Sequence, residues 1–427
     1  MVYNIGMNDK FEKALAAQLG PVYLTQKELT YSVSAGIFLT PYEYSKYLDY
    51  KDELIDHGDD RFIDLPLKSF NSKYIYLSIG EDLNSLINSY LDLLVDDYDQ
   101  NKVFIKDRFA QSLNKSRMYS EIEGSLNVEA VPTTRRRLKE LLEDNKKPET
   151  ANDIIIKNMH TAIKYVEKMP LFNKDNLLEL YNILSDGCLS EDNKLMPGNY
   201  YRHDTVEIGG YHGCPYTQIE ECMDSLFDFV NGVLNTTDKT IRMFIPHICH
   251  YYLLYIHPYF DYNGRTARMV SYWVYLLTNQ KYHPPVISEA INQTKGLYYK
   301  AIEMTRDAHN DLSFFLKYIF SLTCDYILCY KNLEHIEQLL KNKSILLTET
   351  DSNYIKKIMI TYQGKFAYMD FLNNCNVEMT KQGALKTLNK LVEYGFLEVV
   401  ETPSKNKLFD INKKIIKYRI SGKMMYD

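Results

Sequence analysis

One stretch of twelve residues gathers most of the side chains in this chain that could do chemistry together. It runs from His257 to Arg268 and reads His-Pro-Tyr-Phe-Asp-Tyr-Asn-Gly-Arg-Thr-Ala-Arg. One apolar run precedes it and another follows, so the stretch connects two expected helices. Its centre contains the turn-forming residues Asp, Asn and Gly, which predicts that the second helix begins near Asn263 or Gly264.

The expected start of the second helix is suited to bind a chain of phosphates. Arg265 and Arg268 are three residues apart, so their guanidinium groups share one face of the helix. The free N–H groups of a helix start, the positive end of its dipole and two guanidinium groups together favour a polyanion. Asp261, just before the helix, offers the kind of carboxylate that Mg²⁺ takes alongside phosphate oxygens. His257 completes the set as a base whose ordinary pKa lies near neutrality.

Each of these residue types also has an ordinary structural explanation when it is taken alone. A His-Pro pair can end a helix, Asp-x-Asn-Gly can form a turn, and two arginines can belong to a simple helical corner. The whole set, in this order and within twelve positions, is much better explained as a binding site.

The stretch resembles the signature of the Fic (filamentation-induced-by-cAMP) family, which reads histidine-x-Phe-x-Asp/Glu-Gly-Asn-Gly-Arg-x-x-Arg. Two positions depart from it: Tyr259 replaces Phe, and Tyr262 stands where Gly or Ala is usual. The first change is mild. A bulky side chain at position 262 is expected to crowd the phosphate loop or to disfavour a special backbone conformation.

The resemblance implies transfer of AMP from ATP, with Mg²⁺, to a hydroxyl group of a target protein. It implies that His257 takes the proton from a Ser, Thr or Tyr, and that Asp261 holds Mg²⁺ on the α- and β-phosphates. The oxygen would then attack the α-phosphorus, and pyrophosphate would leave. Arg268 would grip the γ-phosphate. The residues that the resemblance assigns to the ATP phosphates are Asn263, Gly264, Arg265 and Arg268.

A glutamate upstream of the signature is expected to hold the enzyme off. The segment 111–150 contains the sequence Ile-Glu-Gly around Glu123, which on pattern alone ends a short acidic helix. It is similar to the family's inhibitory motif Ser/Thr-x-x-x-Glu-Gly/Asn, although Ser120 lies one residue too close to the glutamate. Since one arginine cannot bind a carboxylate and a γ-phosphate bidentately at once, the resemblance predicts a Glu123–Arg268 ion pair.

A second part of the resemblance lies at residues 196–215. Alternation from Val206 followed by two glycines predicts a β-hairpin. In the family, a segment of this form is the flap that aligns the target protein by strand addition. A purely structural hairpin is the other interpretation. The residues predicted to dock the target are Val206, Ile208 and Gly209.

The resemblance covers roughly residues 110–330 and implies an all-helical Fic core with a small β-hairpin flap. Together with the rest of the chain it predicts a mainly α protein in four parts. These parts are a mixed N-terminal region of unknown role at 1–110, an inhibitory segment at 111–150, the Fic core at 151–335 and a C-terminal domain at 350–427.

The C-terminal domain is expected to be a winged helix, a form of helix-turn-helix. Apolar spacing predicts three helices, and two strand-like runs follow at 396–400 and 408–411. From Asp351 to Asp427 there are 13 Lys and Arg against 8 Asp and Glu, which permits contacts with DNA phosphates. Docking of a protein stays open. The residues expected on the outer face of the third helix and on the wing are Lys381, Gln382, Lys386, Lys390, Lys405 and Lys407.

Bulk composition predicts a globular protein of the cytoplasm. Its 427 residues are 45% hydrophobic and 25% charged, and the net charge of −6 argues against nucleic-acid binding by the whole chain. Seven cysteines without CxxC spacing predict reduced thiols. We see neither a signal peptide nor an apolar run of membrane-spanning length, so no membrane partner is expected. Self-modification and a homodimer stay open.

Other functions stay open beside AMP transfer. A Fic relative with Lys in place of the signature's second Gly phosphorylates its target, and Gly264 argues against that reaction. Use of another nucleotide, or removal of AMP, is an alternative within enzymes. A transcription regulator with a degenerate Fic core is the alternative from another class, with Tyr262 as the lesion and the winged helix as the functional part.

Overall fold

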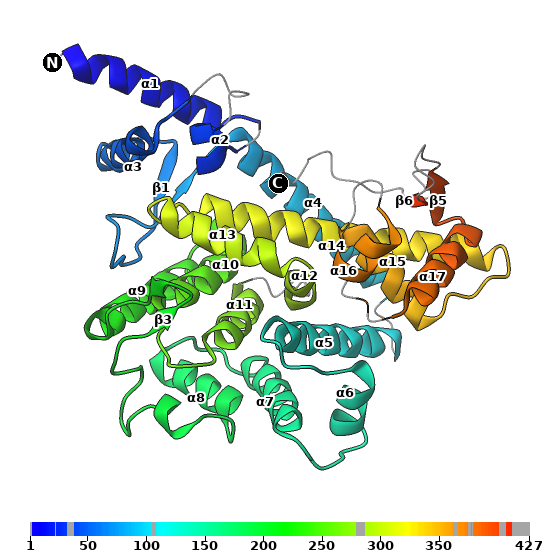
Figure 1. Cartoon of the computed structure of the whole chain (residues 1–427). Helices are drawn as coiled ribbons and strands as arrows, with labels where there is room; N and C mark the ends of the chain where they lie inside the picture. Colours follow the sequence, from blue (N-terminus) through cyan, green and yellow to red (C-terminus); the bar gives the residue numbers. More distant parts are fainter. Residues whose placement is uncertain are drawn as a thin grey trace. The chain divides into compact units, whose positions relative to one another are not determined.

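The computed structural model describes residues 2–21, 23–31, 38–104, 108–278, 287–361, 366–374, 377, 379–400 and 407–411. Within these ranges helices predominate, and the strands form three two-stranded antiparallel sheets (Figure 1). The expectation of a mainly α protein is therefore confirmed. The chain divides into two compact units. Unit 1 comprises Met1–Glu289 and Gly296–Phe320, and unit 2 comprises Ala290–Lys295 and Ser321–Asp427.

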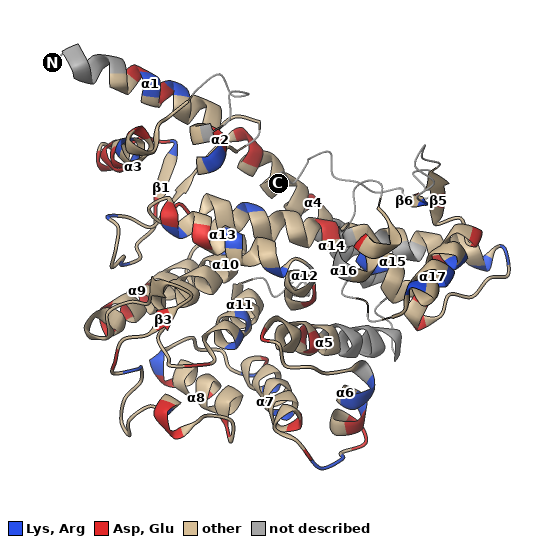
Figure 2. Ribbon diagram, viewed as in Figure 1, with Lys and Arg blue, Asp and Glu red and all other residues tan. Residues whose placement is uncertain are grey.

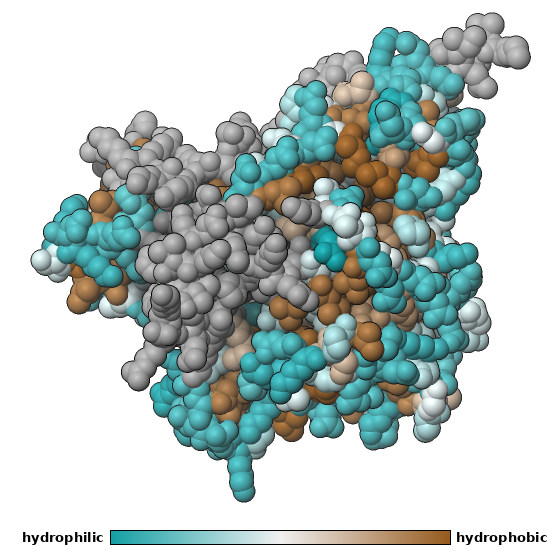
Figure 3. Space-filling model, turned by 180° about the vertical axis from the view of Figure 1, so that it is seen from behind, coloured by the Kyte–Doolittle hydropathy of each residue, from teal (hydrophilic) through white to brown (hydrophobic). Residues whose placement is uncertain are grey.

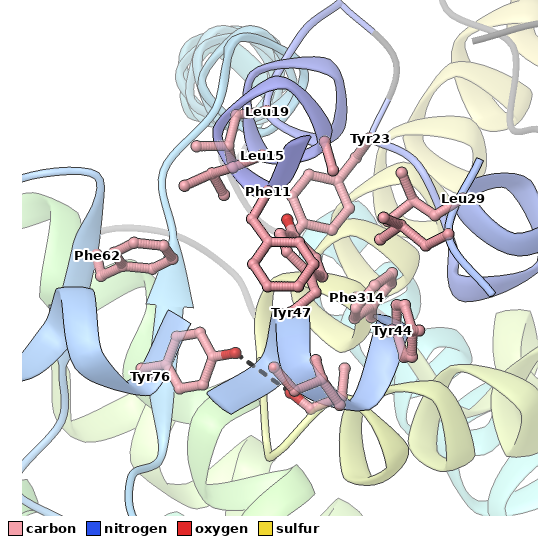
Figure 4. Close-up of a cluster of buried hydrophobic side chains, with 14 residues drawn as sticks. Phe11, Leu15, Leu19, Tyr23, Leu29, Tyr44, Tyr47, Phe62, Tyr76 and Phe314 are labelled. Atoms are coloured by element: carbon pink, nitrogen blue, oxygen red, sulfur yellow. Dashed lines mark hydrogen bonds between the residues drawn. The ribbon is translucent and has the colours of Figure 1, made fainter. Parts of the chain in front are cut away.

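Unit 1 opens with a small helical region that has its own buried cluster. A capping box starts its third helix, because Thr40 and Glu43 each accept the other's backbone N–H. Figure 4 shows aromatic and aliphatic side chains of this region packed together with Phe314, from the start of a later helix. The elements are α1 (Val2–Gln18), α2 (Gln26–Tyr31), α3 (Pro41–Asp56), β1 (Phe62–Asp64) and β2 (Tyr76–Ser78).

A buried ion pair joins this region to the far end of unit 1. The Lys51 ammonium lies 2.6 Å from a carboxylate oxygen of Asp311, and both side chains are almost fully buried. The hydroxyls of Tyr23 and Ser78 donate to the same carboxylate, each at 2.7 Å. Because a buried carboxylate needs several partners, these contacts fix the N-terminal region onto the segment before α14 (Ser313–Lys341).

The rest of unit 1 is a helical assembly around α11. This helix contacts α5, α7, α8, α9 and α10, and Figure 1 shows these helices gathered about it. The elements are α4 (Glu81–Phe104), α5 (Arg108–Val128), α6 (Arg135–Leu142), α7 (Ala151–Val166), α8 (Lys174–Ser185), a 3₁₀ turn (Glu191–Asn193), β3 (Glu207–Ile208), β4 (Tyr211–His212), a 3₁₀ turn (Tyr216–Gln218), α9 (Ile219–Leu234), α10 (Lys239–Ile256), α11 (Asn263–Thr278) and nearly all of α13 (Lys295–Asp307). Helix α12 (Ile287–Gln293) begins in unit 1 and ends in unit 2.

Two predictions about local structure are confirmed and one is wrong. Helix α11 begins at Asn263, and β3 and β4 form the predicted hairpin. Positive φ at both turn glycines gives the hairpin the twist that its strands require. Gly124, however, does not end a helix, since α5 continues to Val128. A Cβ on Gly124 would lie 2.3 Å from the backbone nitrogen of Glu289, so this glycine allows close packing.

Unit 2 contains the three helices and the hairpin that the sequence predicts at its C-terminal end. Buried residues such as Ile355, Leu388 and Phe409 share one apolar cluster, and Gly395 takes a positive φ just after the third helix. The assignment of this arrangement as a winged helix stays a prediction. The elements are α15 (Glu349–Thr361), α16 (Tyr368–Asn374), α17 (Lys381–Glu393), β5 (Leu397–Val400) and β6 (Leu408–Ile411).

Neither unit presents a membrane-spanning segment among its described helices, because none of these is both long and apolar enough. The surface seen in Figure 3 mixes hydrophilic and hydrophobic side chains.

Candidate active site

His257 ends α10 and opens the loop that leads into α11. Its backbone is left-handed, with φ 55° and ψ 62°, and its N–H donates to the carbonyl of Leu253 at 2.9 Å. Burial, and after it the charge of Arg202, lower the pKa of His257 to about 4. The imidazole is therefore neutral at pH 7 and able to accept a proton.

Arg202 ties the hairpin region to the His257 loop. Its Nε donates to the carbonyl of His257 at 2.8 Å, and its two Nη groups donate to the carbonyls of Asp204 and Cys214. Its backbone N–H donates to the carbonyl of Pro258 at 2.9 Å. A buried guanidinium that joins three carbonyls makes charge-assisted hydrogen bonds, so it fixes the loop geometry firmly.

The flap hairpin lies beside the predicted base. Gly213, just after β4, donates its N–H to the carbonyl of Val206 at 3.2 Å. A Cβ on Gly213 would lie 3.3 Å from the Cβ of His257, so the backbone passes close to the imidazole. Val206 and Ile208 are half-buried and Gly209 is exposed at the turn. Their role in docking a target protein stays a prediction.

The side chain of Asn263 shapes the loop from within. Its Oδ1 accepts the N–H of Tyr259 at 3.0 Å, and its Nδ2 donates to the Tyr259 carbonyl at 2.8 Å. Both ends of the amide are thereby engaged. What Asn263 can offer to a phosphate is its backbone N–H at the start of α11.

Asp261 lies at the rim of the loop with its side chain 49% exposed. Its Oδ1 accepts the N–H of Tyr262 at 2.6 Å and lies 3.9 Å from Nη2 of Arg265. Within the described ranges, no group of three or more His, Cys, Asp or Glu could hold a metal ion. A single accessible carboxylate nevertheless fits Mg²⁺, which commonly takes one carboxylate together with phosphate oxygens and waters.

Arg268 is bound by the end of helix α5. Its Nη2 donates to Oε1 of Glu129 at 2.8 Å and to the carbonyl of Ser125 at 3.1 Å. Its Nε donates to the hydroxyl of Ser125 at 2.9 Å. Burial alone would lower the pKa of Arg268, but Glu129, Tyr298 and Glu121 together outweigh it and the net shift is upward. The guanidinium therefore has an internal anion as its partner.

The carboxylate on Arg268 is that of Glu129, so the prediction of a Glu123–Arg268 ion pair named the wrong glutamate. The reason is the register of helix α5, which turns about 100° per residue. Ser125 faces Arg268, and Glu129 follows four residues later on the same side. Glu123 lies only two residues before Ser125, so it points about 160° away around the helix.

Glu129 also covers the start of α11. A Cβ on Gly264 would lie 2.3 Å from Oε1 of Glu129 and 3.2 Å from Nη1 of Arg268. The glycine therefore leaves open a space that the carboxylate fills. This space is bounded by a helix start and a guanidinium, the two groups expected to hold phosphate oxygens.

Tyr262 adopts the backbone conformation that its size was expected to disfavour. Its φ is +66°, and its carbonyl accepts the N–H of Thr266 at 2.9 Å in the first turn of α11. The ring is 4% exposed and lies over the guanidinium of Arg265, with Cζ 3.4 Å from the ring centroid. The side chain is accommodated beside an arginine.

Comparison with known proteins agrees with this geometry. Residues 171–275 match the model of the Fic/DOC family. The chain thus contains a Fic/DOC domain, and that part of the resemblance is confirmed. The inhibitory segment and the winged helix lie outside the matched residues and stay predictions.

Several curated proteins that are similar to this chain are named as enzymes. The proteins named protein adenylyltransferase Fic from Drosophila willistoni and Drosophila melanogaster are each 25% identical over 219 residues. Each match covers 49% of this chain and 41% of the relative. The chain thus spans about 41% of the length of the relatives it matches.

Among solved structures, a Fic family protein from Desulfovibrio desulfuricans G20 is 16% identical, with a TM-score of 0.49. That match covers 78% of this chain and 97% of the other. Fic-1 from C. elegans is 17% identical with a TM-score of 0.45, over 58% of this chain and 72% of the other.

The inhibitory motif of the Fic resemblance has a better match than the one predicted from Glu123. Ser125-Leu-Asn-Val-Glu129 has the spacing Ser-x-x-x-Glu, followed by Ala130 in the position of Gly or Asn. Ala130 takes a φ of +56°, the left-handed conformation that usually selects Gly there. Strict use of the spacing would therefore have identified Ser125 and Glu129 from sequence.

The basic residues predicted to contact DNA lie partly as expected. Figure 2 shows Lys and Arg on α17, where Lys381, Gln382 and Lys386 are exposed. Lys390 is half-buried, and its ammonium pairs with Asp351 at 2.7 Å. Lys407 donates to Asn389, and Lys405 lies outside the described residues. DNA binding stays a prediction for 350–427.

Proposed function

We propose that this protein is an adenylyltransferase that moves AMP from ATP to a Ser, Thr or Tyr hydroxyl of a target protein. The match to the Fic/DOC family and the names of the curated relatives support this reaction class. The observation that carries the proposal is the Glu129 carboxylate bound to Arg268 above Gly264. An anion already fills a space built from phosphate-binding groups.

His257 acts as the base in this reaction. Its low pKa keeps the imidazole neutral, so it can take the proton from the target hydroxyl. The hydroxyl oxygen forms a bond to the α-phosphorus as the bond to the bridging oxygen of the β-phosphate breaks. Pyrophosphate leaves and the target keeps AMP. Val206 is joined to Gly213, whose backbone passes close to His257, and Val206 and Ile208 would pair with the extended target segment.

The phosphates of ATP are held by the loop and the first turn of α11. Arg265 and the backbone N–H groups of Asn263 and Gly264 would bind the α- and β-phosphates, and Arg268 the γ-phosphate. Asp261 would hold Mg²⁺, which when bound neutralises charge that develops on the phosphate oxygens.

Glu129 acts as the inhibitor in place of the glutamate predicted from sequence. Its carboxylate occupies Nη2 of Arg268, which is also held by Ser125. A γ-phosphate and this carboxylate cannot both bind the guanidinium bidentately, and two anions this close to each other would repel. Productive ATP binding therefore requires Glu129 to leave.

The transfer is tested with ATP labelled on either the α- or the γ-phosphate, in the presence of Mg²⁺. An extract of the organism whose genome encodes the protein supplies the target proteins. We compare Glu129→Ala with Glu129→Ala combined with His257→Ala. The proposal predicts label on protein from α-labelled ATP in the first variant, none from γ-labelled ATP, and release of pyrophosphate. The added His257→Ala change should abolish labelling.

Three outcomes would contradict the proposal. Label from γ-labelled ATP would mean phosphoryl transfer. Equal labelling with and without His257 would remove that residue as the base. No label from either nucleotide, with both variants folded, would overturn transfer from ATP.

A further inference from the structure

Tyr262 has three properties that a loop tyrosine rarely combines. Its φ of +66° is left-handed, a conformation that bulky side chains seldom adopt. Its ring is buried to 4% exposure. Burial is also the main cause that raises its pKa to about 12, so the phenol is neutral at pH 7. A strained residue in a phosphate loop calls for a function.

The ring of Tyr262 is the principal support of Arg265. The guanidinium carbon lies 3.4 Å from the ring centroid, which is a close cation–π stack. Among the described residues, Nε and Nη1 of Arg265 have no hydrogen-bond partner although both are buried. Asp261 contributes only a 3.9 Å approach to Nη2.

This arrangement differs from that of the neighbouring Arg268. Nε and Nη2 of Arg268 donate to Ser125 and Glu129. Arg265 is held by the face of its guanidinium, so its buried Nε and Nη1 lack a hydrogen-bond partner among the described residues, whereas in Arg268 only Nη1 does. Stacking fixes the plane of an arginine without using its donors, and the donors can then meet the oxygens of a phosphate.

We propose that Tyr262 is a positioning residue that orients Arg265 for the phosphates of a nucleotide. Its left-handed backbone places the ring, and the ring fixes the guanidinium plane before the ligand arrives. This inference rests on the proposed function in one respect: it takes the ligand of the site to be a chain of phosphates. At the loop position where Gly is usual, this chain has Tyr262, whose ring stacks on the guanidinium of Arg265.

The test measures the dissociation constants of Mg-ATP and of inorganic triphosphate by calorimetry, in the Glu129→Ala background. Tyr262→Asn removes the ring but tolerates a left-handed backbone, whereas Tyr262→Phe keeps the ring. We expect Tyr262→Asn to weaken binding about tenfold, as for loss of a buried cation–π contact. Tyr262→Phe should stay within about twofold of the parent, because it keeps the ring face on which the guanidinium stacks.

A double-mutant cycle separates positioning from a general loss of structure. Arg265→Lys keeps the charge but loses the planar group that stacks. If Tyr262 acts through Arg265, adding Tyr262→Asn to Arg265→Lys should change the dissociation constant little. If Tyr262→Asn does not fold, Tyr262→Leu, which keeps bulk without an aromatic face, is expected to give the same loss.

The inference is overturned if a folded Tyr262→Asn protein binds both ligands like the parent. It is also overturned if the loss is equally large beside Arg265→Lys. Binding of Mg-ATP without AMP transfer would reject the proposed function while the Tyr262 result stands. Failure of the Glu129→Ala parent to bind either ligand would reject both.

Discussion

The carboxylate of Glu129 accepts a hydrogen bond from Nη2 of Arg268 at 2.8 Å and fills the space above Gly264. The two residues are far apart in the chain, since Glu129 directly follows α5 and Arg268 lies in the first turns of α11. The negative end of the α5 dipole lies near the guanidinium and favours the same contact. Displacement of one side chain would therefore open the space proposed for the phosphates.

The pH dependence of the reaction should reflect the low pKa of His257. An ordinary histidine would give an inflection near pH 6.5, because protonation removes the base. Since burial and the charge of Arg202 lower the pKa of His257 to about 4, the rate of Glu129→Ala should stay level from pH 8 to pH 5.5. The measurement is the initial rate of AMP transfer in that range. An inflection near pH 6.5 would contradict this assignment.

Gly264→Ala should separate stability from ligand binding. The new Cβ would lie 2.3 Å from Oε1 of Glu129, which is the end of a flexible side chain and can move. Ala is favoured over Gly in a helix by about 1 kcal/mol, so in the Glu129→Ala background, where that carboxylate is absent, the melting temperature should not fall. The same Cβ occupies space needed by a phosphate, so Glu129→Ala with Gly264→Ala should bind Mg-ATP at least tenfold more weakly than Glu129→Ala. Equal affinity would show that phosphates do not use this space.

Acidification should destabilise unit 1 before most carboxylates titrate. Burial lowers the pKa of His247 to about 3 and that of His250 well below its ordinary value, and His257 is shifted to about 4. The unfolded chain binds these protons near pH 6.5 and the folded chain does not, so stability is present above pH 6.5 and is lost as the pH falls toward 4. Each group contributes about 1.4 kcal/mol per pH unit within that window.

Thermal unfolding of wild type at pH 7 and pH 5 measures this loss. His247→Phe should reduce it, because an aromatic ring can pack in the same place against Phe320 without binding a proton. Identical melting temperatures at the two pH values would contradict the buried, neutral state of these histidines.

Lys51→Met should destabilise the protein strongly. It leaves Asp311 as a buried carboxylate without its cation, and breaking such a pair costs about 3–5 kcal/mol. The exposed pair Lys46–Asp49 offers a matched control, since Lys46→Met should leave the melting temperature nearly unchanged. A small effect of Lys51→Met would mean that the N-terminal region is not fixed by this pair.

Local signals were enough to predict much of the site. Asp, Asn and Gly between two apolar runs located the start of α11, and alternation followed by Gly-Gly located the flap. These signals lie within a few residues of the structure that they predict. The same holds for the helices and the hairpin of unit 2, whose apolar spacing is regular.

Other features depend on contacts between distant residues. Ile-Glu-Gly resembled the inhibitory motif at Glu123, but which glutamate meets Arg268 depends on how α5 faces α11. Lys51 and Asp311 are 260 positions apart, and the residues around each of them do not indicate that the two side chains form an ion pair. Lys390 pairs with Asp351 of α15, a contact between residues 39 positions apart that no local pattern indicates.

The most direct test of the account compares Glu129→Ala with Glu123→Ala. Both changes remove one carboxylate from the same end of α5, but only Glu129 is bonded to Arg268. The measurement is the rate of AMP transfer from α-labelled ATP, with Mg²⁺, in wild type and in each variant. We predict that Glu129→Ala raises the rate at least tenfold and that Glu123→Ala leaves it near that of wild type. Equal rates in all three proteins, or activation by Glu123→Ala alone, would contradict inhibition by Glu129.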